Sequence, residues 1–239
     1  MLRVQALHSK LNVRLGAAAP AIGSDVLSRI EAIWQREKMK RGDKLFDGQV
    51  FSIHQSGPDA IVGWMAEYRH FLAQRRDPSL HAALKISPLA VTGALICRDG
   101  IVFGRRASET EMDAKLWELV PSGSVDGSAV EPDGRVSLER CVLTELEEET
   151  GIRASEVAAT PRAIALIEDL QSHVTDVGLI LEANWSTAQV LERFATLENR
   201  EYGTLEVVAI AAIPEFRRKC GTSLSEVSAS LLDVVVQRV

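Results

Sequence analysis

The sequence predicts an α/β layered domain that is preceded by a smaller α/β extension. From Pro88 onward, short runs rich in apolar and β-favouring residues alternate with helical patterns, and this alternation is typical of helices layered on a sheet. Apolar residues make up 46% and charged residues 25% of the 239 residues. A chain of this size and composition can bury a full core, so a mostly disordered protein is excluded. We expect an extension at residues 1–86 and the main domain at residues 87–239.

Turn and cap residues set the expected elements of the extension. Ser24 is a suitable N-cap for a helix over residues 25–40, and Gly42 is a suitable stop. A strand is expected at residues 50–54. Residues 64–76 then form a stretch rich in aromatic and basic side chains.

The main domain shows a more regular alternation. Asp99-Gly100 is a strong hairpin turn between strands expected at residues 89–97 and 101–105. A loop rich in Gly, Ser, Asp and Pro covers residues 122–134 and leads into a helix over residues 137–150, with Gly151 at its end. Further strands are expected at 116–120, 163–167, 177–181 and 205–210, and further helices at 187–196 and 224–236.

Charge and cysteine content exclude several classes of protein. The net charge of −6 provides no global basic field, so we expect no nucleic-acid partner, and a phosphate-bearing substrate would need local cations. The three cysteines, at positions 97, 141 and 220, have no spacing typical of a zinc site or a disulfide framework. Basic residues interrupt any signal-like segment, and no apolar run could span a membrane. We therefore expect a cytoplasmic protein without a membrane partner.

The acidic helix over residues 137–150 carries an unusual charge pattern. On a helical wheel, Glu145, Glu148 and Glu149 fall on the same side as the apolar face instead of opposite to it. The apolar face consists of Leu138, Cys141, Val142 and Leu146, and the outer side carries Glu139, Arg140 and Glu147.

Three carboxylates on such a stripe repel one another, because positions three and four apart meet on a helix surface. They also lie near the helix C-terminus, where the dipole disfavours anions. A bound cation would remove both penalties, and Mg²⁺ prefers oxygen ligands. The alternative is a solvated acidic helix end, which the position of the three glutamates on the wheel disfavours.

With these residues, the sequence resembles the Nudix hydrolases. Their motif begins with glycine, continues with a glutamate and ends in Arg-Glu-apolar-any-Glu-Glu-any-Gly-apolar. The residues that match the ending are Glu145, Leu146, Glu148, Glu149, Gly151 and Ile152, and Pro121-Ser122-Gly123 resembles the opening. The resemblance implies an α/β/α sandwich with a mixed sheet. It also implies that Glu145, Glu148 and Glu149 bind Mg²⁺ or Mn²⁺, and that Gly123 shapes the loop near the phosphates.

Several features depart from the family motif. Thr144 replaces the arginine that helps to orient the glutamates in the family, Val136 stands at the upstream glutamate position, and the loop after Gly123 is longer than usual. We expect an ordinary search for the motif to miss this chain.

Within the family, the sequence resembles the animal Nudix enzymes that cleave UDP-glucose and UDP-galactose, and the similarity extends to residues 45–47, 68–72 and 88–106.

Other polar residues are candidates for the same site. By the resemblance, Glu201 would assist the metal or the attacking water; the alternative is an exposed loop glutamate, and Glu168 and Asp169 are weaker candidates. Arg105 or Arg106 could pair with phosphate, although a surface pair at a strand end is the simpler interpretation for one of them. Tyr68 and Arg69 combine a stacking surface with a cation, which suits a base and a phosphate; the alternative is an amphipathic helix packed inward.

The expected reaction is hydrolysis of the diphosphate bond in a nucleoside diphosphate linked to a sugar. UDP-glucose or UDP-galactose is the first expectation, with UMP and a sugar 1-phosphate as products. Another nucleotide adduct, such as ADP-ribose or a dinucleotide, is an alternative pyrophosphatase substrate. A non-catalytic Nudix-like module that binds a nucleotide is a third possibility, favoured by the departures at Thr144 and Val136 and opposed by the intact trio of glutamates.

Overall fold

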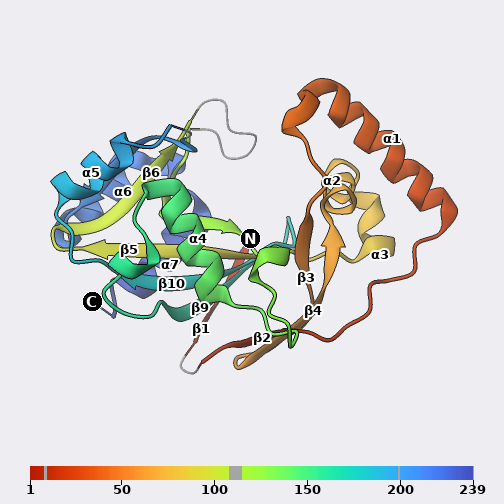
Figure 1. Ribbon diagram of the computed structural model, residues 1–239, viewed down its shortest axis with the longest axis horizontal. Helices are drawn as coiled ribbons and strands as arrows, with labels where there is room; N and C mark the ends of the chain where they lie inside the picture. Colours follow the sequence, from red (N-terminus) through yellow and green to blue (C-terminus); the bar gives the residue numbers. More distant parts are fainter. Residues whose placement is uncertain (8–9, 108–114, 199, 239) are drawn as a thin grey trace.

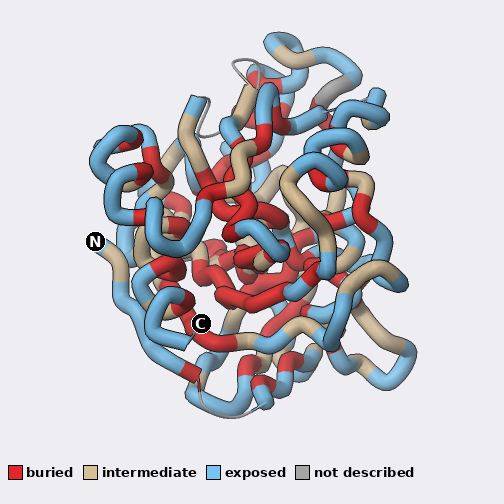
Figure 2. Tube along the Cα trace, turned by 90° about the vertical axis from the view of Figure 1, so that its left-hand side faces the viewer, coloured by how far each residue is buried: buried red, intermediate tan, exposed pale blue. Residues whose placement is uncertain are grey.

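The computed structural model describes residues 1–7, 10–107, 115–198 and 200–238. Figure 1 shows two neighbouring parts: a large sheet with helices on both faces, and a smaller sheet that carries α1, α2 and α3. Buried residues are concentrated in the interior of the molecule, and exposed residues lie around them (Figure 2). Among the described residues, no helix is both long and apolar enough to cross a membrane.

The large sheet is mixed, as predicted. Its strand order is β1-β9-β10-β5-β6-β11, with β7 beside β6 and β8 beside β5. The pair β10 and β5 is parallel, whereas the other pairs are antiparallel. The strands are β1 (Leu2–Ala6), β5 (Leu89–Cys97), β6 (Gly100–Arg106), β7 (Trp117–Leu119), β8 (Ser122–Ser124), β9 (Arg162–Asp169), β10 (Thr175–Glu182) and β11 (Tyr202–Val208).

Helices cover both faces of this sheet and complete a three-layered sandwich. On one face, α4 (Leu138–Thr150) and α5 (Thr187–Ala195) bury Val142, Leu146 and Phe194 in a core shared with β5 and β10. On the other face, α6 (Ile213–Cys220) and α7 (Glu226–Val235) bury Phe216 and Leu231 in a second core. Apolar side chains on both faces of a sheet require cover on both sides. The predicted α/β/α sandwich is thereby confirmed.

The smaller part is built on a three-stranded sheet of order β2-β4-β3. Its strands are β2 (Asn12–Leu15), β3 (Gln49–Ser56) and β4 (Ala60–Glu67), and its helices are α1 (Ser24–Arg41), α2 (Tyr68–Arg76) and α3 (His81–Leu84). Ile30 and Ile33 of α1 pack with Trp64 of β4 and Phe71 of α2 in a core of their own. In the described parts of the chain, the short 3₁₀ turns are Gly42–Lys44, Pro78–Leu80, Gly127–Ala129, Ala154–Glu156, Ile210–Ala212 and Gly221–Ser223.

The two sheets are joined by the chain and by backbone hydrogen bonds. Phe51 N–H donates to the carbonyl of Val125 at 2.7 Å, and Ile53 N–H donates to the carbonyl of Ser87 at 2.8 Å. In addition, β1 pairs with β9 at the edge of the large sheet. A boundary at residue 87 therefore does not separate the two sheets completely, and the division into 1–86 and 87–239 stays a prediction.

Local signals in the sequence placed most element ends within a few residues. The Ser137 side chain caps α4 by accepting a hydrogen bond from Arg140 N–H at 3.1 Å, and Gly151 ends that helix with φ of 78°. The expected cap at Ser24 is wrong by one residue, because the N-cap position is Gly23 and Ser24 already belongs to α1. Helices α3 and α6 and strands β1, β2 and β4 were not anticipated from the sequence, and the loop expected at residues 122–134 is wrong at its start, where Ser122–Ser124 pair with β5 as strand β8.

Candidate active site

Helix α4 brings the three glutamates of the motif to the loop that follows β7. The helix packs on β5 and β8, so its apolar stripe is buried and part of the acidic stripe is carried inward with it. Glu149 is 3% exposed, Glu145 is half-buried and Glu148 is exposed, so the position on the buried side expected from the wheel is wrong for Glu148. Thr144, at the position of the family arginine, is exposed. The residues assigned to the outer side of the wheel, Glu139, Arg140 and Glu147, are all exposed as expected.

Gly123 lies directly beneath the side chain of Glu145. A Cβ atom at position 123 would come 2.0 Å from Glu145 Oε1 and 2.1 Å from its carboxyl carbon, far inside any contact that real atoms make. Gly123 belongs to β8, which pairs with β5 through Val91. The missing side chain therefore gives the Glu145 carboxyl its place against the backbone of β8.

Both carboxyl oxygens of Glu149 have hydrogen-bond partners. Ser122 N–H donates to Oε2 at 3.1 Å, and the hydroxyl of Tyr202 lies 3.2 Å from Oε1. The same hydroxyl lies 2.8 Å from Oε1 of Glu118 on β7. Tyr202 is completely buried, so its hydroxyl joins two buried carboxyls inside the core.

The electrostatics of the acidic residues follow from burial and mutual repulsion. Burial, together with the neighbouring carboxylates of Glu148, Glu201 and Asp126, raises the pKa of Glu145 to about 8. Burial and the charges of Glu201 and Glu145 raise the pKa of Glu149 well above its usual value. A nearby cation would favour the charged forms of these carboxyls and reverse the shifts.

Glu201 and Arg106 meet next to this group. Arg106 forms an ion pair with Glu201 and donates from Nη1 to Glu118 at 2.7 Å. Its side chain is only 15% exposed. The guanidinium thus neutralises carboxylates of the protein itself, and Glu201 acts electrostatically on both Glu145 and Glu149. Burial raises the pKa of Glu118, and Arg106 opposes that rise.

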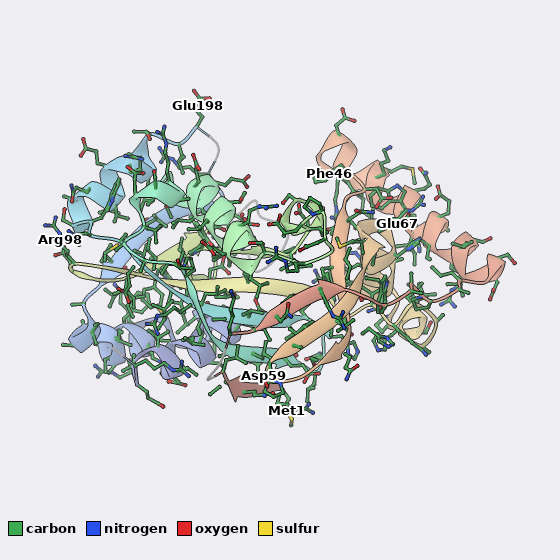
Figure 3. The ribbon with its side chains drawn as sticks, turned by 60° about the horizontal axis from the view of Figure 1, so that its bottom comes forward. Met1, Phe46, Asp59, Glu67, Arg98 and Glu198 are labelled. Atoms are coloured by element: carbon green, nitrogen blue, oxygen red, sulfur yellow. The ribbon has the colours of Figure 1, made fainter. Side chains whose placement is uncertain are left out.

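The other expected substrate residues, Arg105, Tyr68 and Arg69, contact other parts of the protein. Arg105 is exposed, and its Nε lies 3.4 Å from the carbonyl of Lys115. Tyr68 and Arg69 belong to α2 in the smaller part, beside Glu67, which Figure 3 labels on the right of the molecule. Arg69 binds Glu67 at 2.6 Å and Asp47 at 3.2 Å, both within the same part of the chain.

Glu168 and Asp169 lie at the end of β9, where it pairs with β1. Glu168 forms an ion pair with Arg3 at 3.1 Å, and Asp169 accepts a hydrogen bond from Gln171 N–H at 2.9 Å. Both carboxylates therefore have local structural contacts at a sheet edge and a turn.

The carboxylates near α4 have the donor chemistry of a site for a hard divalent cation. Glu145, Glu148, Glu149 and Glu201 provide oxygen ligands, which Mg²⁺ and Mn²⁺ accept, and a cation would offset the repulsion that raises their pKa values. Their oxygens do not converge on one point: across the described ranges, no three acidic, histidine or cysteine side chains are arranged to hold an ion. Some of these glutamate side chains would have to rotate before their oxygens could bind one ion together.

A cavity of about 960 Å³ opens at the opposite end of α4, beside its N-cap Ser137. Its lining combines Leu7, directly after β1, and segments of β2 and β9 with the basic side chains of Lys10, Arg135, Arg162 and Arg238. The glutamates of the motif are not among the residues that line it. This hollow and the acidic group are therefore separate features of the molecule.

Sequence reasoning missed Glu118, Asp126 and Tyr202 as members of the acidic group. Glu118 had a usable signal, because a glutamate between Trp117 and Leu119 in a short apolar strand must be buried or paired. Tyr202 directly follows Glu201 but gave no signal, since a buried tyrosine is more often a core residue. Asp126 lies in the long loop, where aspartates are ordinary turn residues.

Comparisons with known proteins support the fold. No family model and no curated protein matches the sequence. A crystal structure of DR0079 from Deinococcus radiodurans is similar with a TM-score of 0.50 and 15% identity, covering 80% of this chain and 98% of that one.

Two further solved structures are similar at lower TM-scores. A MutT NUDIX hydrolase from Burkholderia pseudomallei has a TM-score of 0.39 and 21% identity, covering 62% of this chain and 96% of its own. An Ap4A hydrolase from C. elegans has a TM-score of 0.42 and 12% identity, covering 63% and 96%. At these identities the likeness concerns the fold alone. The likeness to DR0079 shows that a solved structure shares the fold of this chain, a mixed sheet between two helical layers.

Proposed function

We propose that this chain is a divalent-metal-dependent hydrolase of the diphosphate bond in a nucleoside diphosphate linked to a sugar. UDP-glucose and UDP-galactose are the first candidate substrates. The observation that carries the proposal is the placement of Glu145 and Glu149: both are drawn inward against the Ser122–Gly123 backbone, where burial and neighbouring carboxylates disfavour their charge. Perturbed acidic groups gathered in this way are typical of functional sites.

Glu145, Glu148 and Glu149 are the proposed metal ligands, with Glu201 beside them. A divalent ion there would offset phosphate charge and lower the pKa of water. The residues of the chain have separate tasks. Gly123 leaves space for the Glu145 carboxyl, and Ser122 N–H fixes one oxygen of Glu149. Water attacks one phosphorus, the bridging P–O bond breaks, and UMP and a sugar 1-phosphate leave.

Arg106 is better suited to hold Glu201 and Glu118 than to bind phosphate, because both carboxylates already contact its guanidinium. Arg105 is exposed at the end of β6 and is the stronger candidate of the pair for a phosphate contact. Tyr68 and Arg69 stay candidates for base and sugar recognition, although the contacts of Arg69 with Glu67 and Asp47 favour a structural role.

The test is a screen of diphosphates with matched variants. Wild-type protein is incubated with UDP-glucose, UDP-galactose, ADP-ribose or a dinucleoside polyphosphate, with Mg²⁺, with Mn²⁺ or with EDTA. Phosphatase then releases phosphate from any monophosphate product. We expect turnover of a UDP-sugar that EDTA abolishes. Glu149→Gln should lose orders of magnitude in kcat, while Glu147→Gln, an exposed neighbour on the same helix, should not.

The second candidate function is a nucleotide-binding module without catalysis. It is favoured by the exposed Thr144 in place of the family arginine and by the carboxylates that do not converge. Calorimetric binding of a UDP-sugar or ADP-ribose without turnover of any compound in the screen would favour this function over hydrolysis. If ADP-ribose is the single compound hydrolysed, the proposed diphosphate hydrolysis holds and the proposed UDP-sugar substrate is wrong.

A further inference from the structure

A buried series of polar side chains runs from β6 to α4 through the core of the large sheet. Arg106 Nη1 donates to Glu118 Oε1 at 2.7 Å, and the Tyr202 hydroxyl lies 2.8 Å from that same oxygen. The hydroxyl also lies 3.2 Å from Glu149 Oε1. Glu118 is 7% exposed, Glu149 is 3% exposed and Tyr202 is fully buried. Side chains from three strands and a helix thus form one connected series, in which the phenolic oxygen links Glu118 to Glu149.

The hydroxyl of Tyr202 has little freedom to leave this position. Its ring packs in the core formed by α4, α5 and the large sheet. On β6, a Cβ atom at Gly104 would lie 2.5 Å from the Tyr202 ring, so the ring occupies the space that a side chain there would fill. Close packing of this kind fixes a rotamer, and the hydroxyl is carried to a defined place between the two carboxyls.

Glu149 depends on this hydroxyl for one of its two oxygens. Ser122 N–H anchors Oε2, but a single hydrogen bond leaves the carboxyl plane free to turn about that contact. The one proton of the hydroxyl lies between Glu118 Oε1 at 2.8 Å and Glu149 Oε1 at 3.2 Å, and this second contact at Oε1 limits the turning of the carboxyl plane. Groups that orient a metal-binding side chain from behind typically change metal affinity or activity when they are removed.

We propose that Tyr202, braced by the Arg106–Glu118 ion pair, is a positioning residue that sets the orientation of the Glu149 carboxyl for metal binding. The inference rests on the proposed function, since it assigns Glu149 to the ion. Tyr202 touches neither substrate nor ion in this assignment. It acts through Glu149, and its own place is set by Glu118 and by the space at Gly104.

The test compares Tyr202→Phe with Thr150→Val. The first removes the hydroxyl and keeps the packed ring. The second removes another fully buried hydroxyl, one residue from Glu149, that bonds only to backbone: it donates to the Leu146 carbonyl at 2.6 Å and accepts from Ile152 N–H at 3.1 Å. Both changes remove one buried hydroxyl, so a general loss of stability should be similar in the two variants.

Three quantities are measured for each protein: the melting temperature in EDTA, the Kd of Mn²⁺ from paramagnetic resonance of the free ion, and kcat and KM on the preferred diphosphate. We expect Tyr202→Phe to raise the Mn²⁺ Kd or lower kcat by about 10- to 100-fold, with a smaller change in KM. Thr150→Val should keep wild-type Mn²⁺ affinity and kcat.

The outcomes separate the inference from the proposed function. If the wild type binds Mn²⁺ and hydrolyses a diphosphate while Tyr202→Phe behaves identically, the inference alone is overturned. Equal losses in Tyr202→Phe and Thr150→Val also overturn it, because they would reflect only a disturbed core. A wild type that neither binds Mn²⁺ nor hydrolyses any diphosphate overturns the proposed function. If Tyr202→Phe does not fold, Glu118→Gln tests whether the Arg106–Glu118 ion pair holds Tyr202 in place. We expect this variant to lose less Mn²⁺ affinity than Tyr202→Phe, and an unchanged affinity would contradict the inference.

Discussion

Gly123 and Glu145 lie so close together that a Cβ atom on residue 123 would come 2.0 Å from Glu145 Oε1. The obstacle is a side chain and not backbone, so Gly123→Ala should fold and push the carboxyl aside. We expect a large loss of kcat with a loss of at most about 1–3 kcal/mol in the free energy of unfolding. Steady-state kinetics and chemical denaturation measure the two effects.

The control for this substitution is Gly57→Ala in the β3–β4 turn, where an added Cβ would make only an ordinary contact at 3.8 Å. It should leave kcat unchanged. Wild-type kcat in Gly123→Ala would show that the position of Glu145 against β8 does not matter for the reaction.

Metal ions should stabilise the wild type more than Glu148→Gln. Like charges around Glu145 are relieved by a bound cation, and binding to the folded state raises the melting temperature by mass action. We expect millimolar Mg²⁺ or Mn²⁺ to raise the wild-type melting temperature clearly, and that of Glu148→Gln less. Glu147→Gln, on the exposed side of the same helix, should respond like the wild type. Equal shifts in all three proteins would mean that the ions act non-specifically.

Arg69→Ala should lower stability and leave KM unchanged. The guanidinium contacts Glu67, Asp47 and, at 4.0 Å, Glu31 of α1, so it ties α1 and α2 to the loop before β3. Because these groups are partly exposed, we expect a loss of only about 1 kcal/mol. Arg36→Ala on the exposed face of α1 is the control in thermal melts. A raised KM at unchanged melting temperature would instead support the substrate-binding role predicted from the sequence.

Glu37 should make stability depend on pH in the acidic range. Burial alone would raise its pKa, but Lys40, Arg76 and Arg41 outweigh that effect and lower it from 4.5 to about 2. A lowered pKa in the folded state means that the contribution is complete above about pH 4.5 and is lost as the pH falls towards 2. Glu37→Gln should therefore cost about 2 kcal/mol at pH 7 and less at pH 3.

Chemical denaturation of the wild type and Glu37→Gln from pH 7 to pH 3 measures how the difference between their free energies of unfolding shrinks as the pH falls. Glu139→Gln, at an exposed position on α4, controls for the removal of one negative charge. A constant difference between the wild type and Glu37→Gln across the range would contradict the assignment of the ion pairs to folded-state stability.

The sequence by itself determined the local features of the candidate site. The apolar spacing of α4 fixed which of its faces is buried, and Ser137 and Gly151 fixed where it begins and ends. The glutamates at positions 145 and 149 share that buried side, as the wheel predicts. These features depend on residues three and four apart, which interact within one helix whatever surrounds it. Gly123 was singled out through the resemblance alone, and the reason for a glycine there is its contact with Glu145.

Only the tertiary structure decided what surrounds those glutamates. Tyr202 of β11 pairs with Arg106 of β6, and Glu118 of β7 reaches both of them, across almost a hundred residues of chain. Strand β1 likewise joins β9 from the far end of the sequence. Pairing between distant strands depends on register and on packing throughout the sheet, which no local pattern encodes. The helix therefore follows from its own residues, whereas the buried partners that orient Glu149 follow from the order of strands in the completed sheet.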